Sequence, residues 1–412
     1  MDQLGRIVTG KTPSSERPEE FGDKYPFITP SDIPATKKHV QVERYLSERG
    51  LERHRKNQLP SKTTCVVCIG ATVGKVCMTH ETSVSNQQIN SIIPTKGEYD
   101  ADFVYYISTT LRDALMAFAS GAATPIVNKS TFSSIKLLVP EYEAQRKIAA
   151  ILSGYDDLIE NNRLRIALLQ RLSEEIYREW FVRLRFPGHN KVKVVKGVPS
   201  GWKVRPLGSL AAEIKRGIKK RDLADDMKYI GLEHIPRRSI ALDEWTTADT
   251  VQSDKLLFEE RDILFGKIRP YLHKVVIASF GGACSSDTIV LRPKEKCYEG
   301  YLLFTVFSDT FVELATVASK GTKMPRADWN FLQRLEVVVP HEKLLERYQT
   351  QFDNIFRHIA KLLRTNEFLL TSRVLLLSRL MSGKIPVKNL NVKFPPSMVK
   401  EFSQKLDPTS HA

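Results

Sequence analysis

The 412-residue sequence lacks the short motifs that identify several large enzyme classes. It contains no H-E-x-x-H, no G-x-S-x-G and no Asn/Asp-Pro-Pro-aromatic segment, so metalloprotease, hydrolase and amino-methyltransferase chemistry lack their usual residues. Its nine histidines are scattered, and none is paired at helical spacing with a second metal ligand. The residues therefore give no account of bond-making or bond-breaking by this chain.

Long apolar runs and a second cysteine pair are also missing. No stretch of ~18 apolar residues occurs and no charged-then-apolar leader opens the chain, so we expect no membrane span, no signal peptide and a cytoplasmic protein. Of the five cysteines, only Cys65 and Cys68 form a C-x-x-C pair, and they lie in a strand-like run. Residues three apart on a strand point to opposite faces, so packed free thiols are favoured over a zinc site.

One segment resembles a phosphate-binding loop but does not match its full motif. The segment from Gly70 to Val76 is one residue shorter than G-x-x-x-x-G-K-S/T and has Val76 where the metal-binding hydroxyl belongs, so a turn between strands is favoured over a nucleotide loop. Arg269–Lys274 takes the same place later in the chain, without the glycines but with the lysine. This indicates that Lys75 and Lys274 matter more than a phosphate cradle.

The sequence contains two copies of one ordered set of anchor residues. Anchor residues recur in order at offsets between 199 and 203: Leu4-Gly5 and Leu207-Gly208, Ile28 with Ile33-Pro34 and Ile230 with Ile235-Pro236, Lys75-Val76 and Lys274-Val275, Pro94 and Pro293, Gly121 with Pro125 and Gly321 with Pro325, Val139-Pro140 and Val339-Pro340. This period is far longer than that of a solenoid repeat and indicates a duplicated domain. A duplicated binding domain implies a target with two related parts.

Each copy begins with a mixed half, which we predict to be α+β. Strand-like runs occur at Cys65–Ile69, Ile89–Ile93 and Leu137–Val139 in copy one, and at Asp262–Phe265, Thr288–Leu291 and Leu335–Val339 in copy two. A shorter amphipathic helix is predicted before the last strand of each copy, around Phe103–Ala119 and Tyr301–Ala318.

Each copy ends with a long helix that has a heptad pattern. Apolar residues repeat at a and d positions, which predicts a seam formed by Ile148, Leu152, Tyr155, Ile159, Leu169, Ile176, Phe352, Ile355, Ile359, Leu362, Leu369 and Leu376. Burial of the two stripes against each other is the simplest outcome, and dimerisation with another chain is the alternative. Asn162 and Asn366 interrupt the stripe, either as register-fixing core residues or at a solvated edge.

The chain is basic, with a formal net charge of +15, and the excess is spread over both copies. Such a distribution is expected of a protein that touches an extended polyanion. Cations and polar residues on glycine-bearing loops at matched places give the candidate contacts: Lys11, Thr12, Lys75, Asn128 and Lys129 in copy one, and Arg216, Lys219, Lys220, Lys267, Arg269, Lys274, Lys323 and Arg326 in copy two. A plain solvated loop is the alternative for each of them.

These residues resemble, over almost the whole length of the chain, the DNA sequence-specificity subunit of type I restriction–modification enzymes. The features that carry the resemblance are Leu4-Gly5 with Gly10-Lys-Thr-Pro13, Gly121-x-x-x-Pro125, Gln145-Arg-Lys-Ile-Ala149, Glu175–Phe181, Gly201-Trp202, Asp262-Ile-Leu264, Gly321-x-x-x-Pro325 and Leu380–Ile385. The resemblance implies two target-recognition domains, at 1–140 and 201–340, that each read one half of a split double-stranded DNA site. It also implies two long helices, at 141–185 and 341–384, that form an antiparallel coiled coil, with a linker at 186–200. The basic tail at 385–412 is a departure from the family, because it extends past the usual end.

The resemblance further implies a chain without catalysis or cofactors of its own. Methyltransferase subunits would dock on the helices and bring S-adenosylmethionine, and restriction subunits would bring ATP, Mg²⁺ and translocation. Two rival functions are a self-contained nuclease or methyltransferase with its own recognition domains, and a coiled-coil scaffold that binds only protein. The missing cofactor motifs disfavour the first, and the cationic excess on both mixed domains disfavours the second.

Overall fold

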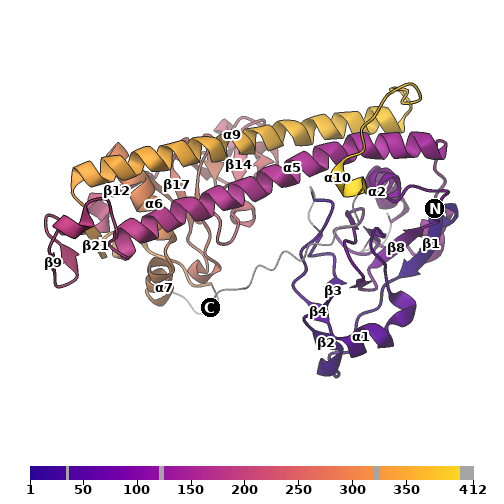
Figure 1. Ribbon diagram of the computed structural model, residues 1–412, viewed down its shortest axis with the longest axis horizontal. Coiled ribbons are helices and arrows are strands. Elements are labelled where there is room, and N and C mark those ends of the chain that lie inside the picture. Colours follow the sequence, from indigo (N-terminus) through magenta and orange to yellow (C-terminus); the bar gives the residue numbers. More distant parts are fainter. Residues whose placement is uncertain (34–36, 120–124, 320–323, 400–412) are drawn as a thin grey trace. The chain divides into compact units, whose positions relative to one another are not determined.

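The computed structural model of the chain describes residues 1–33, 37–119, 125–319 and 324–399. Its contacts divide the chain into two compact units. Unit 1 comprises Met1–Asn161 with Glu367–Ala412, and unit 2 comprises Asn162–Asn366. Each unit therefore contains the mixed half of one copy and a part of both long helices (Figure 1).

Unit 1 is built on two four-stranded sheets. The first is antiparallel and has the order β1-β8-β5-β6, with β1 at Gly5–Thr9, β8 at Ile89–Pro94, β5 at Thr64–Val67 and β6 at Val76–Met78. The second has the order β2-β4-β3-β7, with β2 at Phe21–Gly22, β4 at Tyr45–Leu46, β3 at Tyr25–Ile28 and β7 at Val84–Ser85. The pair β3–β7 is parallel.

The central strand β5 has a core on each of its faces. Cys65 and Val67 lie in one apolar cluster, while Val66 and Cys68 lie in another. Both cysteines are free and buried, and burial raises the pKa of Cys68 to about 11. The expectation that the C-x-x-C thiols point to opposite faces is confirmed, because each packs in a different core.

Unit 2 repeats the topology of the antiparallel sheet and has one strand more in its second sheet. Its antiparallel sheet has the order β12-β20-β17-β18, with β12 at Ala211–Glu213, β20 at Thr288–Pro293, β17 at Ile263–Gly266 and β18 at Val275–Ile277. The second sheet has the order β13-β16-β19-β14-β15, with β13 at Gly217–Ile218, β16 at Lys255–Phe258, β19 at Gly282–Cys284, β14 at Lys228–Ile230 and β15 at Thr246–Thr247. The pair β14–β19 is parallel, as β3–β7 is in unit 1, so the duplication inferred from the sequence is confirmed.

The single amphipathic helix predicted in each mixed half is instead two short helices. Unit 1 has α2 at Ala101–Thr109 and α3 at Arg112–Phe118, and unit 2 has α6 at Glu299–Phe307 and α7 at Asp309–Val317. The break in unit 2 has a local cause, because the Ser308 side chain accepts a hydrogen bond from the Phe311 amide and so caps α7. The helix axis turns by 62° at that point.

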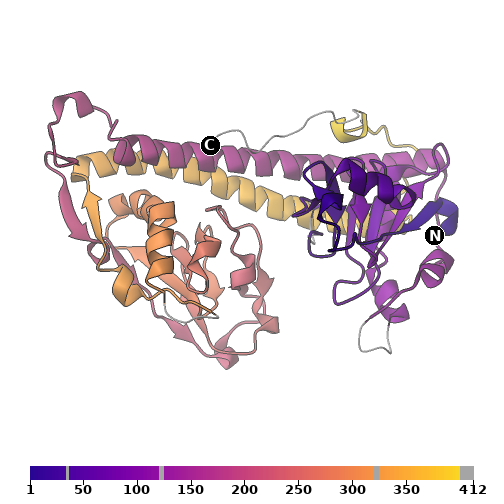
Figure 2. The ribbon, with the colours of Figure 1, turned by 90° about the horizontal axis from the view of Figure 1, so that it is seen from below.

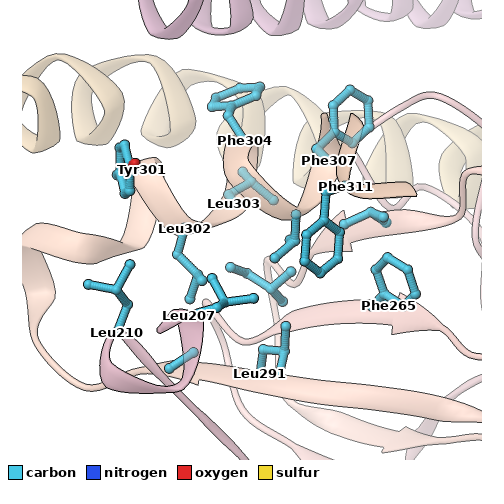
Figure 3. Packing of buried hydrophobic residues seen from close by; sticks show 14 of the residues in the cluster. Leu207, Leu210, Phe265, Leu291, Tyr301, Leu302, Leu303, Phe304, Phe307 and Phe311 are labelled. Carbon is cyan, nitrogen blue, oxygen red and sulfur yellow. The ribbon is translucent and has the colours of Figure 1, made fainter. Parts of the chain in front are cut away.

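Helix α6 packs between the antiparallel sheet of unit 2 and the long helix α9, which spans Glu342–Met381. Figure 3 shows Leu302 of α6 pointing toward Leu207 and Leu210, with Phe304 on another side of the helix. A Cβ atom on Gly300 would lie 2.5 Å from the ring of Phe352 in α9. The absence of a side chain at Gly300 is thus what lets the two helices approach so closely.

The last predicted strand forms in unit 2 and does not form in unit 1. In unit 2, β21 at Glu336–Val339 pairs with β11 at Lys203–Pro206. In unit 1, residues 135–140 have no partner strand within the described part of the chain, and the Leu138 side chain is 95% exposed. The strand expected at Leu137–Val139 was therefore wrong, because an extended segment becomes a strand only when another segment satisfies its backbone groups.

The helix α5 spans Tyr142–Tyr177 and continues as a π-helical turn to Val182. In unit 1, Ile148 and Leu152 of α5 share a core with Leu376 and Leu380 of α9. The Asp156 carboxylate forms an ion pair with Arg373, and both side chains are largely buried. Residues late in α9 thus contact residues early in α5, so the helices are antiparallel where they meet in this unit (Figure 2).

In unit 2 the same two helices form a second stretch of seam. Ile166 and Leu169 of α5 cluster with Ile355, Ile359, Leu362 and Leu363 of α9. The side-chain amide of Asn162 donates a 2.8 Å hydrogen bond to the Asn366 side-chain oxygen, and both residues are buried. The two asparagines are therefore partners inside the seam, and of the two alternatives the solvated edge is excluded.

The seam is wider than the predicted a and d stripe. Of the other predicted members, Ile159 and Phe352 are buried, whereas Tyr155, Ile176 and Leu369 are half-buried. Phe356 and Leu363 are buried more deeply than the predicted Ile355 and Leu362. An α-helix drifts by about 20° per heptad against a strict seven-residue repeat, so the buried face moves to the neighbouring positions.

The described part of the predicted basic tail packs on unit 1. The Lys147 ammonium donates a 2.7 Å hydrogen bond to the Lys388 carbonyl, and the Arg146 guanidinium lies 4.5 Å from the Phe394 ring centroid. The short helix α10, at Pro396–Val399, is joined to α5 by a 3.2 Å hydrogen bond from the Ser397 amide to the Asp157 carboxylate. Residues 386–399 thus form a strap over the first half of α5.

Candidate nucleic-acid interface

Loops at one end of the antiparallel sheet of unit 1 come together, and several predicted site residues lie on them. Strands β1 and β5 end where β8 and β6 begin, so the loops 10–13, 68–75 and 85–88 meet there. The Lys11 amide donates to the Ser85 carbonyl at 2.8 Å, and the Cys68 amide donates to the Gln88 carbonyl at 2.8 Å. Residues 125–128 join them, and we call these four segments the unit 1 loop cluster.

Unit 2 holds its corresponding loops with the same backbone hydrogen bonds. The bond from the Gly70 amide to the Pro125 carbonyl in unit 1 is matched by one from the Arg269 amide to the Pro325 carbonyl. The bond from the Val127 amide to the Cys68 carbonyl is matched by one from Ala327 to Lys267. We call residues 267–274, 285–287 and 324–327 the unit 2 loop cluster.

Four of the five predicted contacts of unit 1 are exposed on or next to its cluster, but they are not equally free. The Lys11 and Lys129 side chains are exposed, and the Thr12 hydroxyl donates to the Gln87 side-chain amide oxygen. Asn128 caps the helix α4, at Lys129–Ser134, because its side-chain oxygen accepts a 2.8 Å hydrogen bond from the Thr131 amide. The exposed amide of Asn128 is thus partly committed to the fold.

Lys75 and Lys274, two of the predicted DNA contacts, each donate a hydrogen bond to a backbone carbonyl of their own unit. The Lys75 ammonium donates to the Ile33 carbonyl at 2.9 Å, and the Lys274 ammonium donates to the Leu232 carbonyl at 2.5 Å. Both lysines are half-buried, and burial lowers the pKa of Lys274. Each lysine braces its own unit through a carbonyl that lies 42 residues before it.

Three predicted residues of unit 2 lie together on its loop cluster. The Lys267 ammonium donates to the Ser286 carbonyl at 3.1 Å, and the Arg326 guanidinium forms a 3.3 Å ion pair with Asp287. Arg269 is exposed, and its guanidinium has no hydrogen-bond or ion-pair partner among the described residues. Lys323, Gly121 and Gly321 lie outside the described residues.

The basic run that opens copy two lies at the edge of the second sheet. Arg216 precedes the edge strand β13, and its guanidinium lies 3.8 Å from the Glu259 carboxylate. Lys219 follows the strand and is exposed. The Lys220 ammonium donates to the Gln252 side chain at 2.8 Å. The pairing of Leu256 with both Gly217 and Cys284 places Gly217 level with Cys284 across the intervening strand β16, and the turn 285–287 of the unit 2 loop cluster follows Cys284.

Two features of these clusters were missed by the sequence analysis. The turn Asn86-Gln87-Gln88 carries three side-chain amides in the middle of the unit 1 loop cluster, and Gln87 is exposed. Side-chain amides are the groups that pair with adenine edges in the major groove. The signal was available, because three consecutive amide residues stand directly before a predicted strand. The exposed Tyr271 of unit 2, 54% accessible, gave no comparable signal.

The described residues offer little for other chemistry. No group of three or more His, Cys, Asp or Glu side chains among them is arranged to hold a metal ion. Among them, too, no single helix is long and apolar enough to cross a membrane, although the bent pair Lys296–Phe307 and Asp309–Val317 has the necessary length and composition.

Comparison with known proteins gives a consistent result. The sequence matches the family described as the type I restriction modification DNA specificity domain over residues 1–171 and again over residues 199–365. It is 24% identical over 405 residues to the type I restriction enzyme MjaIX specificity subunit of Methanocaldococcus jannaschii, covering 94% of this chain and 93% of that one. It is 40% identical over 183 residues to the HindI specificity subunit of Haemophilus influenzae, covering 42% and 39% of the two chains.

A solved structure shares the fold. The S subunit of a type I restriction-modification system from M. genitalium aligns with a TM-score of 0.53 at 16% sequence identity. The alignment covers 92% of this chain and 94% of that one.

Proposed function

Because the chain belongs to the family of type I restriction modification DNA specificity domains, we propose that it is the non-catalytic specificity subunit of such an enzyme. It reads a bipartite double-stranded DNA target, with one part of the target bound by each unit. The observation that carries this proposal is the repetition of the loop cluster, with matched backbone hydrogen bonds and different side chains in the two units.

Contact with DNA involves two kinds of side chain, which lie on the loop clusters or, for Lys219, at the edge of the second sheet of unit 2. Cations such as Lys11 and Lys219 are exposed and suited to phosphates, which fix the position of a protein on the duplex without reading its sequence. Amides and guanidinium groups, such as those of Gln87 and Arg269, are suited to base edges in the major groove. Each unit therefore has the groups for both positioning and reading.

The helices supply surfaces for partner subunits. On the part of α5 in unit 2, Leu164, Leu168 and Leu172 recur every four residues and are 44%, 63% and 51% exposed. Residues four apart lie on one face of a helix, so these leucines form an apolar stripe that faces away from the seam. We infer that methyltransferase subunits cover it and bring S-adenosylmethionine, and that restriction subunits, with ATP and Mg²⁺, join the same complex.

Salt-dependent DNA binding tests this proposal. The complex of the chain with its methyltransferase subunits is titrated with duplex DNA by gel shift over a series of salt concentrations, and log affinity should fall linearly with log salt. Lys11→Gln and Lys219→Gln should each weaken binding to all sequences and lower the slope by about one unit. Lack of sequence-specific binding by the wild-type complex would refute the proposal.

A further inference from the structure

The loop between β5 and β6 in unit 1 and the loop between β17 and β18 in unit 2 both have a positive φ angle at each end, with different residues at those ends. In unit 1 it runs from Gly70 to Gly74, whose φ angles are 97° and 86°. In unit 2 it runs from Arg269 to His273, whose φ angles are 51° and 52°. Glycine adopts this left-handed region freely, whereas arginine and histidine do so against the steric preference of their Cβ atoms. Unit 2 therefore retains strain at two positions where unit 1 has none.

The strain at His273 is explained by packing. Its side chain is 3% exposed, and its ring lies 4.6 Å from the ring of Phe307 in α6. The imidazole thus fills part of the unit 2 core, which glycine would leave empty. A residue in a disfavoured conformation persists when such contacts hold it there.

No comparable packing explains Arg269. Its backbone amide is fixed to the Pro325 carbonyl at 2.8 Å, and this bond is also made by Gly70 in unit 1 without a side chain. Its guanidinium is exposed and unpaired among the described residues, whereas the neighbouring Lys267 and Arg326 are bound to Ser286 and Asp287. The backbone of Arg269 is therefore held in place by a hydrogen bond, whereas its guanidinium makes no hydrogen bond or ion pair among the described residues.

We propose that Arg269 reads a guanine in the half-site bound by unit 2. The inference rests on the proposed function and adds the base and the residue that reads it. A guanidinium can donate two parallel hydrogen bonds to O6 and N7 of guanine, and a fixed backbone limits the freedom that the side chain loses on binding. Gly70 offers no side chain at the matched place, so the half-site of unit 1 has no equivalent guanine contact.

The test uses Arg269→Gly, which removes the side chain at a position where glycine is the better residue for the backbone. The complex of the variant with its methyltransferase subunits should assemble, and its melting temperature should not fall. His273→Gly is the matched control, because it changes the other end of the same loop without touching Arg269; its melting temperature should fall and its base preference should stay that of the wild type.

Binding to a panel of single-base variants of the target gives the readout. For Arg269→Gly, the preference for one G·C pair in one half-site should drop by roughly 5- to 150-fold, with the other half-site unaffected. An equal loss on every sequence would overturn the inference by making Arg269 a phosphate contact, and an unchanged preference at every position would overturn it as well. Either result leaves the proposed function standing, because the wild-type complex still binds its target specifically.

Discussion

Unit 1 and unit 2 share backbone hydrogen bonds in their loop clusters and differ in the side chains that the clusters expose. The matched hydrogen bonds at Gly70 and Arg269 join backbone atoms. The matched hydrogen bonds of Lys75 and Lys274 join a side-chain ammonium to a backbone carbonyl. The exposed groups differ, with the amide of Gln87 in unit 1 and the guanidinium of Arg269 in unit 2. A duplicated framework can therefore be held constant by internal contacts while its surface comes to read different sequences.

The largest effect on stability is expected from a substitution in the helix seam, to which the long helices of both copies contribute. Ile359 is 1% exposed, so Ile359→Asp places a carboxylate in an apolar cluster and should destabilise unit 2 by about 3 kcal/mol or more. Thermal unfolding followed by circular dichroism measures the change. Unaltered stability would show that α5 and α9 do not pack through this face.

A buried ion pair should make unit 1 sensitive to acid. Burial alone would raise the pKa of Asp102, but Lys38 and Lys62 together lower it below its ordinary value. A carboxylate with a lowered pKa stabilises the fold above its unfolded pKa, and this stability is lost as the pH falls through the folded value.

Replacing that carboxylate tests the assignment. Asp102→Asn leaves the buried Lys38 without its charged partner and should cost about 3 kcal/mol at neutral pH. The difference between the variant and the wild type should shrink as the pH is lowered below about 4. Chemical denaturation over a pH series checks this, and a difference that is independent of pH would contradict the role given to the Asp102 charge.

The two matched lysines should affect stability rather than DNA binding. Lys75→Met and Lys274→Met each leave a backbone carbonyl without its donor, so each should cost about 1–3 kcal/mol. The slope of log affinity against log salt should stay that of the wild type in both variants. A slope reduced by about one unit, with stability unchanged, would return these lysines to the DNA interface.

The smallest effect on stability is expected next to the seam, on the exposed stripe of α5. Leu168 is 63% exposed while its neighbour Leu169 packs in the seam, so Leu168→Glu should change stability by less than about 0.5 kcal/mol. It should nevertheless weaken assembly with methyltransferase subunits, measured by size-exclusion chromatography. Leu169→Asp serves as the comparison, because it should lower the melting temperature of the chain itself.

The features that the sequence predicted are those with a regular period or an exact recurrence. The duplication, the two long helices and the α+β character follow from anchor residues and from heptads, which local chain geometry translates directly into structure. The second sheet of each unit was not predicted, because its strands are as short as two residues and pair over long separations, as Ile28 does with Ser85. No local pattern marks such a pairing.

The site was predicted in part, and its gaps also have physical reasons. Lysines on glycine-bearing loops look alike in a sequence, and only the fold shows that Lys75 and Lys274 point at carbonyls while Lys11 is exposed. The left-handed backbone at Arg269 could not be foreseen, because non-glycine residues rarely adopt it. Comparison with Gly70 in the other copy was the one available hint.

The central claim, that each unit reads its own half of a split target, is tested most directly by sequencing the methylated bases of a genome modified by the complex. The account predicts one bipartite motif, in which two defined parts are separated by a spacer of undefined sequence. Two readers on one face of the duplex would place the centres of these parts roughly 10 bp or a multiple of that apart. A single continuous methylated motif would contradict the account.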